Sequence, residues 1–565
     1  MSAPRDLSRW FPFLSWPRPD AALLRGEIGA GLTVALVMIP QSVAYAALAG
    51  MPVITGLYAA LLPALVAVLL GNSTRVSVGP AALTCLLVAA SLSGLAQPGS
   101  PHWVALAVWL AILSGLIQLA LGAGGFGWVL NLISVPVLTG FTQAAALLIM
   151  ASQLPAFLGL RGGLSSLLTQ PQFDVRSLAF GVGSLALLVL GKRLAPRLPM
   201  VVLVMCGAAV VSRFSGYSAT GAIIGNLPSG LPSFYWPELP GWDTFGALLV
   251  PAMVIALVSF LETAASAKIE ARRDGRLWND NQDLIAQGMA KLASAFSGSF
   301  ATSSSFSRSA IALYAGGRTG WSTVAMAGFV LMALLFLTPL LFHVPLAVLA
   351  AVVLTAVATL LKPMALPRLW RIDRAEAVTA GITFAVTLLT APRIYWGVLA
   401  GVLMGLAHFL YHRLHPRIIE VGLHPDGSLR DRHLWKLPPL AAHLYALRMD
   451  DELDFASASA FERAISDHLA AHPDTRHVCL FAQPINRIDA TGVEGFAQLR
   501  AGLAERGITL HISGIKLPVE RVLRRAGALD EAPLLRMYRT DADALQALRA
   551  LPGAEAAADL AAAEA

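Results

Sequence analysis

Arg308 is the side chain of this sequence best suited to holding an anion. It stands in an apolar stretch, and hydroxyl groups lie near it in the sequence at Ser303, Ser304 and Ser307. A guanidinium group in hydrocarbon costs roughly 2.5–3.5 kcal/mol on insertion scales, so it is expected only where it faces a cavity or a partner. The alternative is that the Arg308 side chain reaches a membrane surface and the hydroxyl groups only cap a helix.

A second set of polar side chains lies in the first apolar run. Gln41 follows Pro40, so an amide that both donates and accepts hydrogen bonds stands beside a residue that bends helices. This amide would either bind an oxyanion or join neighbouring helices. Tyr45 lies one turn further along the same face and would either line the same cavity or pack in the core.

Glu262 is an isolated acidic residue, the only one between Asp243 and Glu270. Acidic side chains in such apolar surroundings are often proton carriers in transporters, so Glu262 is a candidate for proton coupling. The alternative is an ordinary ion pair with Lys268 or Arg272 at the end of the same helix.

The composition places these residues in a membrane. Of the 565 residues, 56% are hydrophobic and only 13% are charged, whereas soluble domains carry about 25% charged residues. Apolar runs of roughly 18 residues or more recur from residue 28 to residue 410, and each can cross a hydrocarbon core about 30 Å thick. The alternation typical of a membrane barrel is absent, so the spans are predicted to be helical. The hydrophobic composition excludes a water-soluble enzyme.

Fourteen hydrophobic segments are predicted within residues 21–415, in two halves of about 21–225 and 243–415. They begin near Ala21, Thr55, Val78, Trp103, Leu132, Val175, Val201, Thr244, Gln282, Ser303, Ser322, Val344, Glu376 and Ile394.

The orientation in the membrane follows from basic clusters in three loops, after the sixth, eighth and twelfth segments. These clusters are Lys192, Arg193 and Arg197; Lys268, Arg272, Arg273 and Arg276; and Lys362, Arg368, Arg371 and Arg374. Residues 214–243 contain no Lys or Arg. The positive-inside rule therefore predicts that residues 1–20 and the C-terminus are cytoplasmic, and that the net charge of +7 reports orientation rather than nucleic-acid binding.

The third and tenth segments look interrupted. The third opens with residues 76–80 (VSVGP) and the tenth follows residues 297–305 (SGSFATSSS), and both stretches break or cap helices. Each half of the chain would then contain a broken third helix, which is the best sequence pointer to a transporter binding site. Two helix N-termini that meet in the membrane, each with about half a positive charge, would bind an anion beside Gly79 and Ala81.

The composition changes near Pro416, where charged residues reach soluble density. Residues 416–439 are predicted to be a linker, residues 440–551 a small α/β domain, and residues 552–565 a disordered tail. Thr491 and Glu494 fit a capping box at the start of a helix. The sharper hypothesis is that Thr491 is a regulatory phosphorylation site.

Nearly the whole chain resembles the SulP family of sulfate permeases and anion exchangers, which includes prestin and bacterial bicarbonate and dicarboxylate carriers. The resemblance rests on residues 39–46 (IPQSVAYA), 56–58 (GLY), 77–80 (SVGP), 137–141 (VLTGF), 281–288 (NQDLIAQG), 305–309 (SFSRS) and 315–319 (AGGRT). The tail resembles a STAS domain, the module shared with anti-sigma-factor antagonists.

The resemblance implies two inverted repeats of seven helices, a core and a gate domain, and an anion held between the third and tenth helices. It places Gln41, Tyr45, Ser307 and Arg308 at the substrate, Glu262 at the acid of bacterial members, and Thr491 at the phosphorylated serine of the antagonists. A homodimer is a further implication. Two departures affect the choice of substrate: Ala81 stands where animal relatives often carry Phe, and Ala301 stands where Pro is common.

These observations predict a secondary transporter of small anions (sulfate, bicarbonate or dicarboxylate) in the bacterial inner membrane, in contact with membrane lipid. Its mechanism would be alternating access coupled to H⁺, with Na⁺ as the other candidate ion. A membrane sensor that signals through a protein partner of its tail, or a nucleobase carrier of the same fold, are the rival hypotheses. An enzyme is disfavoured because no nucleotide-binding, zinc-protease or serine-hydrolase motif is present. We expect no cofactor, and the three cysteines have no metal-ligand spacing.

Overall fold

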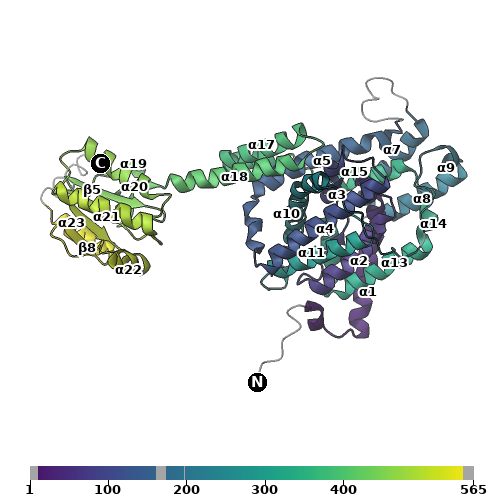
Figure 1. Ribbon diagram of the computed structural model, residues 1–565, viewed down its shortest axis with the longest axis horizontal. Coiled ribbons are helices and arrows are strands. Elements are labelled where there is room, and N and C mark those ends of the chain that lie inside the picture. Colours follow the sequence, from purple (N-terminus) through teal and green to yellow (C-terminus); the bar gives the residue numbers. More distant parts are fainter. Residues whose placement is uncertain (1–10, 161–172, 196–197, 229, 552–565) are drawn as a thin grey trace. The chain divides into compact units, whose positions relative to one another are not determined.

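The structure is a computed structural model that describes residues 11–160, 173–195, 198–228 and 230–551. It divides into two compact units, Met1–Gly405 and Leu406–Ala565. The first unit is a bundle of helices and the second is built on a sheet (Figure 1). Arg197, the first ten residues of the predicted N-terminal segment and the predicted tail 552–565 lie outside the described residues.

Each of the fourteen predicted segments corresponds to a helix that begins within four residues of the expected position. In chain order these helices are α1 (Ala21–Leu48), α2 (Thr55–Leu70), α3 (Ala82–Leu92), α4 (Pro101–Ala123), α5 (Val135–Leu158), α7 (Val175–Leu194), α8 (Met200–Phe214), α10 (Trp242–Arg273), α11 (Asp280–Phe296), α12 (Phe306–Tyr314), α13 (Trp321–Met332), α15 (Leu346–Ala358), α17 (Arg374–Leu389) and α18 (Tyr395–Leu414).

In the part of the chain that the structure describes, seven spans are by themselves long and apolar enough to cross a membrane, and they involve α1, α4, α5, α7, α10, α13 and α18. The span that starts with α13 continues through the π-helical turn Ala333–Leu337 into α14 (Thr338–Leu341). Helices α2, α3, α8 and α15 are apolar but shorter. The short helices α9 (Tyr217–Thr220) and α16 (Ala365–Ile372) connect longer ones.

The predicted interruptions of the third and tenth segments are present. Helices α3 and α12 have 11 and 9 residues, which at 1.5 Å per residue gives lengths of about 17 and 14 Å, well short of a membrane core. A two-residue strand precedes each one, β1 (Val78–Gly79) before α3 and β2 (Ser303–Ser304) before α12. The strands pair antiparallel, with Gly79 opposite Ser303, so the two helices leave this small sheet in opposite senses. That is the arrangement expected for the third helices of two inverted repeats.

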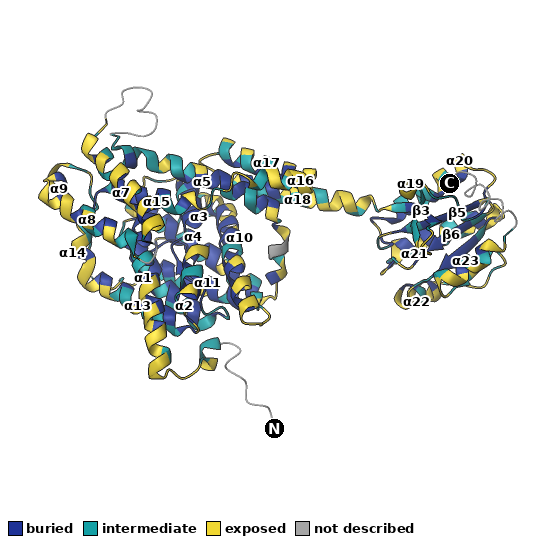
Figure 2. Cartoon of the chain, turned by 180° about the vertical axis from the view of Figure 1, so that it is seen from behind, coloured by how far each residue is buried: buried dark blue, intermediate teal, exposed yellow. Residues whose placement is uncertain are grey.

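Close packing of α4 against α11 forms part of the buried centre of this unit. A Cβ atom on Gly288 would lie 2.7 Å from the carbonyl oxygen of Gly115, and one on Gly122 would lie 2.8 Å from the Ile285 side chain. Small residues therefore let the two helix backbones approach closely. Figure 2 shows buried residues concentrated around α3, α4 and α11, while α8 and α14 carry many exposed residues.

The second unit contains a six-stranded sheet in the order β4-β3-β5-β6-β7-β8. Its strands are β3 (Ile418–Leu423), β4 (Leu429–Asp431), β5 (Leu444–Met449), β6 (His477–Phe481), β7 (Thr509–Ser513) and β8 (Leu535–Tyr538). Strands β5 to β8 are parallel, as in an α/β domain. The helices are α19 (Arg432–Trp435), α20 (Ala458–Ala471), α21 (Ala490–Glu505), α22 (Leu517–Arg525) and α23 (Asp541–Arg549).

The interpretation of residues 416–439 as a linker is wrong. Strand β3 pairs antiparallel with both β4 and β5, so this segment supplies two strands of the sheet. Ile419 and Val421 are buried and alternate with the more exposed Glu420, which is the period of a strand with one buried face. The charged residues around β3 hid this short alternation.

Candidate functional site between the half-helices

The N-termini of α3 and α12 form a pair of uncapped helix ends. No side chain caps α3, whose N-cap residue is Ala81, and none caps α12, whose N-cap residue is Ser305. The first N–H groups of a helix have no partner within the helix, and the helix dipole concentrates positive potential there. Because β1 and β2 are paired, these two ends are held on either side of one small sheet. The arrangement provides donors for an anion without any charged side chain.

Arg308 lies in the first turn of α12 and is 0% exposed. Its Nε donates to Ser77 Oγ at 3.4 Å and its Nη1 donates to Gln41 Oε1 at 3.3 Å, both long hydrogen bonds. Its Nη2 is buried and has no hydrogen-bond partner among the described residues. This excludes the alternative in which Arg308 reaches a surface. A buried guanidinium group that retains an unused donor is prepared to bind a further acceptor.

Gln41 and Tyr45 of α1 are both buried beside this arginine. The Gln41 amide is 9% exposed and accepts the Arg308 hydrogen bond, so it orients the guanidinium group. Tyr45 is 5% exposed, and the charges of Arg308 and Glu262 both act on its hydroxyl group. The structure thus brings the first segment and the tenth segment together as expected.

Glu262 of α10 connects the two half-helices. Its Oε2 accepts a hydrogen bond of 2.5 Å from Ser303 Oγ in β2 and one of 3.3 Å from Thr84 Oγ1 in α3. Neither Lys268 nor Arg272 makes an ion pair with it among the described residues. The carboxyl group therefore contacts one hydroxyl group of strand β2 and one of helix α3, and the ordinary ion-pair alternative does not hold.

The remaining predicted site residues fall into two groups. Gly79, Ala81, Ser303 and Ser304 are buried at the paired strands, and the Ser304 hydroxyl has no partner among the described residues. A Cβ atom on Gly79 would lie 2.8 Å from the Met38 Cε, so the strand packs closely on α1. Ser307, in contrast, is exposed, and its hydroxyl group lies 3.2 Å from Ser305 Oγ. Ser303 and Ser304 form strand β2 and do not cap α12, so the alternative in which they only cap this helix does not hold.

Sequence reasoning missed Lys291, which lies in α11 and is 0% exposed. Its Nζ donates to Gln118 Oε1 at 2.9 Å. Lys291 is the only charged residue between Asp283 and Arg308, so the isolation that singled out Glu262 also marks this lysine. Thr84 and Ser77 were missed as well, because hydroxyl groups in apolar segments carry no distinctive spacing.

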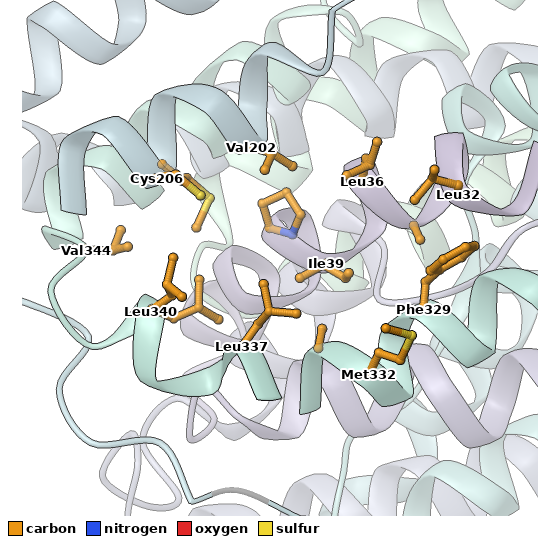
Figure 3. Close-up of a pocket in the computed structure, with 15 residues that line it drawn as sticks. Leu32, Leu36, Ile39, Val202, Cys206, Phe329, Met332, Leu337, Leu340 and Val344 are labelled. Atoms are coloured by element: carbon orange, nitrogen blue, oxygen red, sulfur yellow. The ribbon is translucent and has the colours of Figure 1, made fainter. Parts of the chain in front are cut away.

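A separate apolar cavity of about 190 Å³ lies between α1, α8, α13 and α14. Figure 3 shows side chains such as Ile39, Val202, Phe329 and Leu337 around it. Its lining side chains carry no charge and are apolar apart from the Cys206 thiol, so this cavity is distinct from the polar site. Among the described residues, no cluster of His, Cys, Asp or Glu could hold a metal ion.

In the second unit, Thr491 is exposed near the start of α21. The predicted capping box is wrong, because the N-cap residue is Asp489, whose carboxylate accepts from Gly492 N at 2.8 Å. The same carboxylate accepts from Phe455 N at 3.0 Å, which ties the preceding loop to the helix. The Thr491 hydroxyl group therefore does not cap α21.

Two family models match this chain. The sulfate permease family model matches residues 24–383, and the STAS domain model matches residues 441–544. A probable sulfate transporter of Mycobacterium tuberculosis is 33% identical over 539 residues, covering 93% of this chain and 95% of that protein. The chloroplastic sulfate transporter 4.1 of Arabidopsis thaliana is 30% identical over 553 residues, covering 92% and 80%.

Solved structures share the fold at lower identity. The murine SLC26A9 anion transporter, in an inward-facing state, aligns with a TM-score of 0.86 at 21% identity and covers 98% of this chain and 96% of its own. The transmembrane domain of a cyanobacterial bicarbonate transporter, BicA, aligns with a TM-score of 0.57 at 20% identity, covering 69% and 99%.

The matched family and the relatives named here are transporters, which confirms that the chain is not an enzyme. The broken helices and the buried arginine agree with the motifs on which the sequence resemblance rests. The chain belongs to the sulfate permease family of multi-pass anion transporters and carries a C-terminal STAS domain.

Proposed function

We propose that the chain is a secondary active transporter that takes up a small anion (sulfate, bicarbonate or a dicarboxylate) together with a proton by alternating access. Arg308 and the N-termini of α3 and α12 would hold the anion. Gln41, Tyr45 and the hydroxyl groups of Ser303 and Ser304 would line the same site, and Glu262 would carry the proton.

The observation that carries this proposal is the unused Nη2 donor of Arg308, buried at the start of an uncapped helix. An unpaired charge in a dry site is costly, and a bound anion removes that cost. Two half-helix N-termini directed at one place suit an anionic group for the same electrostatic reason. The names of the relatives favour sulfate among the candidate anions.

The contacts that join the two half-helices would let them move as one body, as the proposed alternating access requires. The half-helices are joined by the β1–β2 pair, by the hydrogen bond of 2.9 Å from Ser77 N to Ser309 Oγ, and by the one of 3.0 Å from Ser305 N to Ser77 O.

We further propose that both termini lie in the cytoplasm, that the protein resides in a bacterial inner membrane, and that it forms a homodimer. The STAS domain would receive a cytosolic protein partner, with Thr491 as its phosphorylation site.

A substrate panel in proteoliposomes tests the transport proposal. The purified chain should accumulate at least one of radiolabelled sulfate, bicarbonate and succinate, and uptake should be faster when the outside is acidic. Empty liposomes are the control. Absence of flux for every anion would favour the membrane-sensor hypothesis, and inhibition by uracil would favour a nucleobase carrier.

Replacing Glu262 by Gln should remove the pH dependence of uptake. The amide still accepts the hydrogen bonds from Ser303 and Thr84 but carries no exchangeable acidic proton. Initial uptake rates at the two pH values should become equal, while exchange of internal for external anion continues. Glu238→Gln is the matched control, because Glu238 is exposed. An unchanged pH profile in Glu262→Gln would contradict the coupling role.

A further inference from the structure

Lys291 is a charged residue inside the helical bundle, and the transport proposal gives it no role. It is 0% exposed, and its only hydrogen-bond partner among the described residues is the neutral Gln118. It makes no ion pair with any described carboxylate. Taking an ammonium group out of water costs several kcal/mol unless another charge compensates it. A buried lysine in this position therefore needs a physical reason.

Hydrogen bonds link Lys291 to the Ser259 hydroxyl group, and other hydrogen bonds link the Ser259 carbonyl oxygen to Glu262. The two sets meet at the residue Ser259 but share no hydrogen-bonding atom. Gln118 accepts from Lys291 Nζ at 2.9 Å and donates through Nε2 to Ser259 Oγ at 3.1 Å. The Ser259 carbonyl oxygen lies 3.0 Å from Ser303 Oγ, and Ser303 Oγ lies 2.5 Å from Glu262 Oε2. Residues of α11, α4, α10 and β2 thus connect the ammonium group with the carboxyl group.

The Ser303 hydroxyl group has one proton and two close acceptors, the Ser259 carbonyl oxygen and Glu262 Oε2, while the Ser304 carbonyl oxygen is more distant at 3.5 Å. When Glu262 is ionised, the hydroxyl proton points to the carboxylate. When Glu262 is protonated, the carboxyl group can donate to Ser303 Oγ, and the hydroxyl proton then points to Ser259. The protonation state of Glu262 is therefore transmitted to strand β2, which Ser303 begins and which leads into α12.

Charged groups around these two sets of hydrogen bonds are few. Helices α2 and α4, which pack against α11, contain no Asp, Glu, Lys or Arg. Glu262 is the charged group that acts on Lys291. The titratable groups that act on or face Glu262 from the packed elements are Lys291 of α11, Arg308 of α12, Cys85 of α3 and Tyr45 of α1. Arg308 and Lys291 are the two positively charged groups that act on Glu262. When a bound anion neutralises Arg308, Lys291 remains to balance the Glu262 carboxylate.

We propose that Lys291 is a positioning residue for proton coupling: its ammonium group is the fixed counter-charge of Glu262 and acts through Gln118, Ser259 and Ser303. This inference rests on the proposed function. A fixed ammonium group balances the ionised carboxylate without a mobile metal cation. Proton release from Glu262 then leaves a neutral pair inside the bundle rather than an isolated negative charge.

Replacing Lys291 by Met removes the charge and keeps the length of the side chain. Without the ammonium group, the ionised form of Glu262 is less favourable, so the midpoint of the pH dependence of uptake should move to higher pH by about one unit. Lys291→Gln, which can still donate to Gln118, should shift the midpoint in the same direction and provides a second variant if Met impairs folding. Lys192→Met, at an exposed lysine, should leave the midpoint in place.

A measurement without transport separates this inference from the proposed function. Infrared difference spectra of the purified full chain in liposomes, recorded against pH, follow the carbonyl band of protonated Glu262, identified by its loss in Glu262→Gln. The midpoint of this band should move upward by about one pH unit in Lys291→Met and Lys291→Gln. An unmoved band would overturn the role of Lys291, even if uptake falls. A moved band with pH-independent transport would overturn only the coupling proposal.

Discussion

Replacing Arg308 by Gln should reduce anion uptake to the background of empty liposomes. The substitution removes the guanidinium charge beside the uncapped ends of α3 and α12, but it keeps a planar amide whose nitrogen takes the position from which Arg308 Nε donates to Ser77. Loss of one partner from a buried charge pair costs about 2–5 kcal/mol, which corresponds to a roughly 30-fold or larger loss of anion affinity. Initial rates over a range of sulfate concentrations measure this effect.

A matched control separates loss of binding from loss of structure. Arg318 is exposed and lies ten residues further along the chain, where its backbone N–H, not its side chain, bonds to Glu27. Arg318→Gln should therefore transport normally. Arg308→Lys should retain part of the activity, because an ammonium group restores the charge but not the planar set of donors. Wild-type uptake by Arg308→Gln would exclude this site as the place where the anion binds.

Much of the helical unit was predictable because its signals are local. Long apolar runs fixed the number of segments, and the interruptions at residues 76–80 and 297–305 marked the half-helices. Glu262 and Arg308 stood out because each is an isolated charge in apolar surroundings.

The hydrogen-bond partners were not predictable, since they depend on which helix faces which. Nothing in the sequence alone pairs Glu262 with Thr84, 178 positions away, or Gln41 with Arg308, 267 positions away. The choice between a substrate contact and a helix cap at Ser303 stayed open for a related reason. Its hydroxyl group is a good helix cap locally, but pairing of its strand with Gly79 prevails over that local preference. Strand β3 was missed because charged neighbours outweighed a six-residue alternation.

The loop between α2 and β1 is held by two buried acidic residues. Backbone N–H groups of Asn72 and Ser73 donate to Asp283 Oδ1 at 2.7 and 3.2 Å, and Ser73 Oγ and Trp278 Nε1 donate to Oδ2 at 2.5 and 2.7 Å. The next two N–H groups donate to Glu270. Four consecutive backbone N–H groups therefore donate to two carboxylates. These hydrogen bonds anchor the chain just before strand β1, which belongs to the candidate site.

Replacing Asp283 by Ala should lower the free energy of unfolding of the helical unit more than the substitutions Glu262→Gln, Glu238→Gln or Asp243→Ala. The Asp283 residue is 3% exposed, and its removal leaves backbone and indole N–H groups of partly buried residues without their acceptor, each costing up to about 1–3 kcal/mol. Since the groups share one environment, the costs do not simply add, and we expect a loss of about 3–5 kcal/mol in the free energy of unfolding.

Denaturant unfolding of the purified chain in detergent, compared with Asp243→Ala, measures this loss. Asp243 is exposed in the first turn of α10, where removal of a carboxylate costs less than about 1 kcal/mol. Because Asn72 and Ser73 lead into β1, hydrogen exchange should rise first at residues 72–79 of Asp283→Ala. Equal stability of the two variants would show that water replaces the carboxylate in this loop and that Asp283 does not anchor the strand.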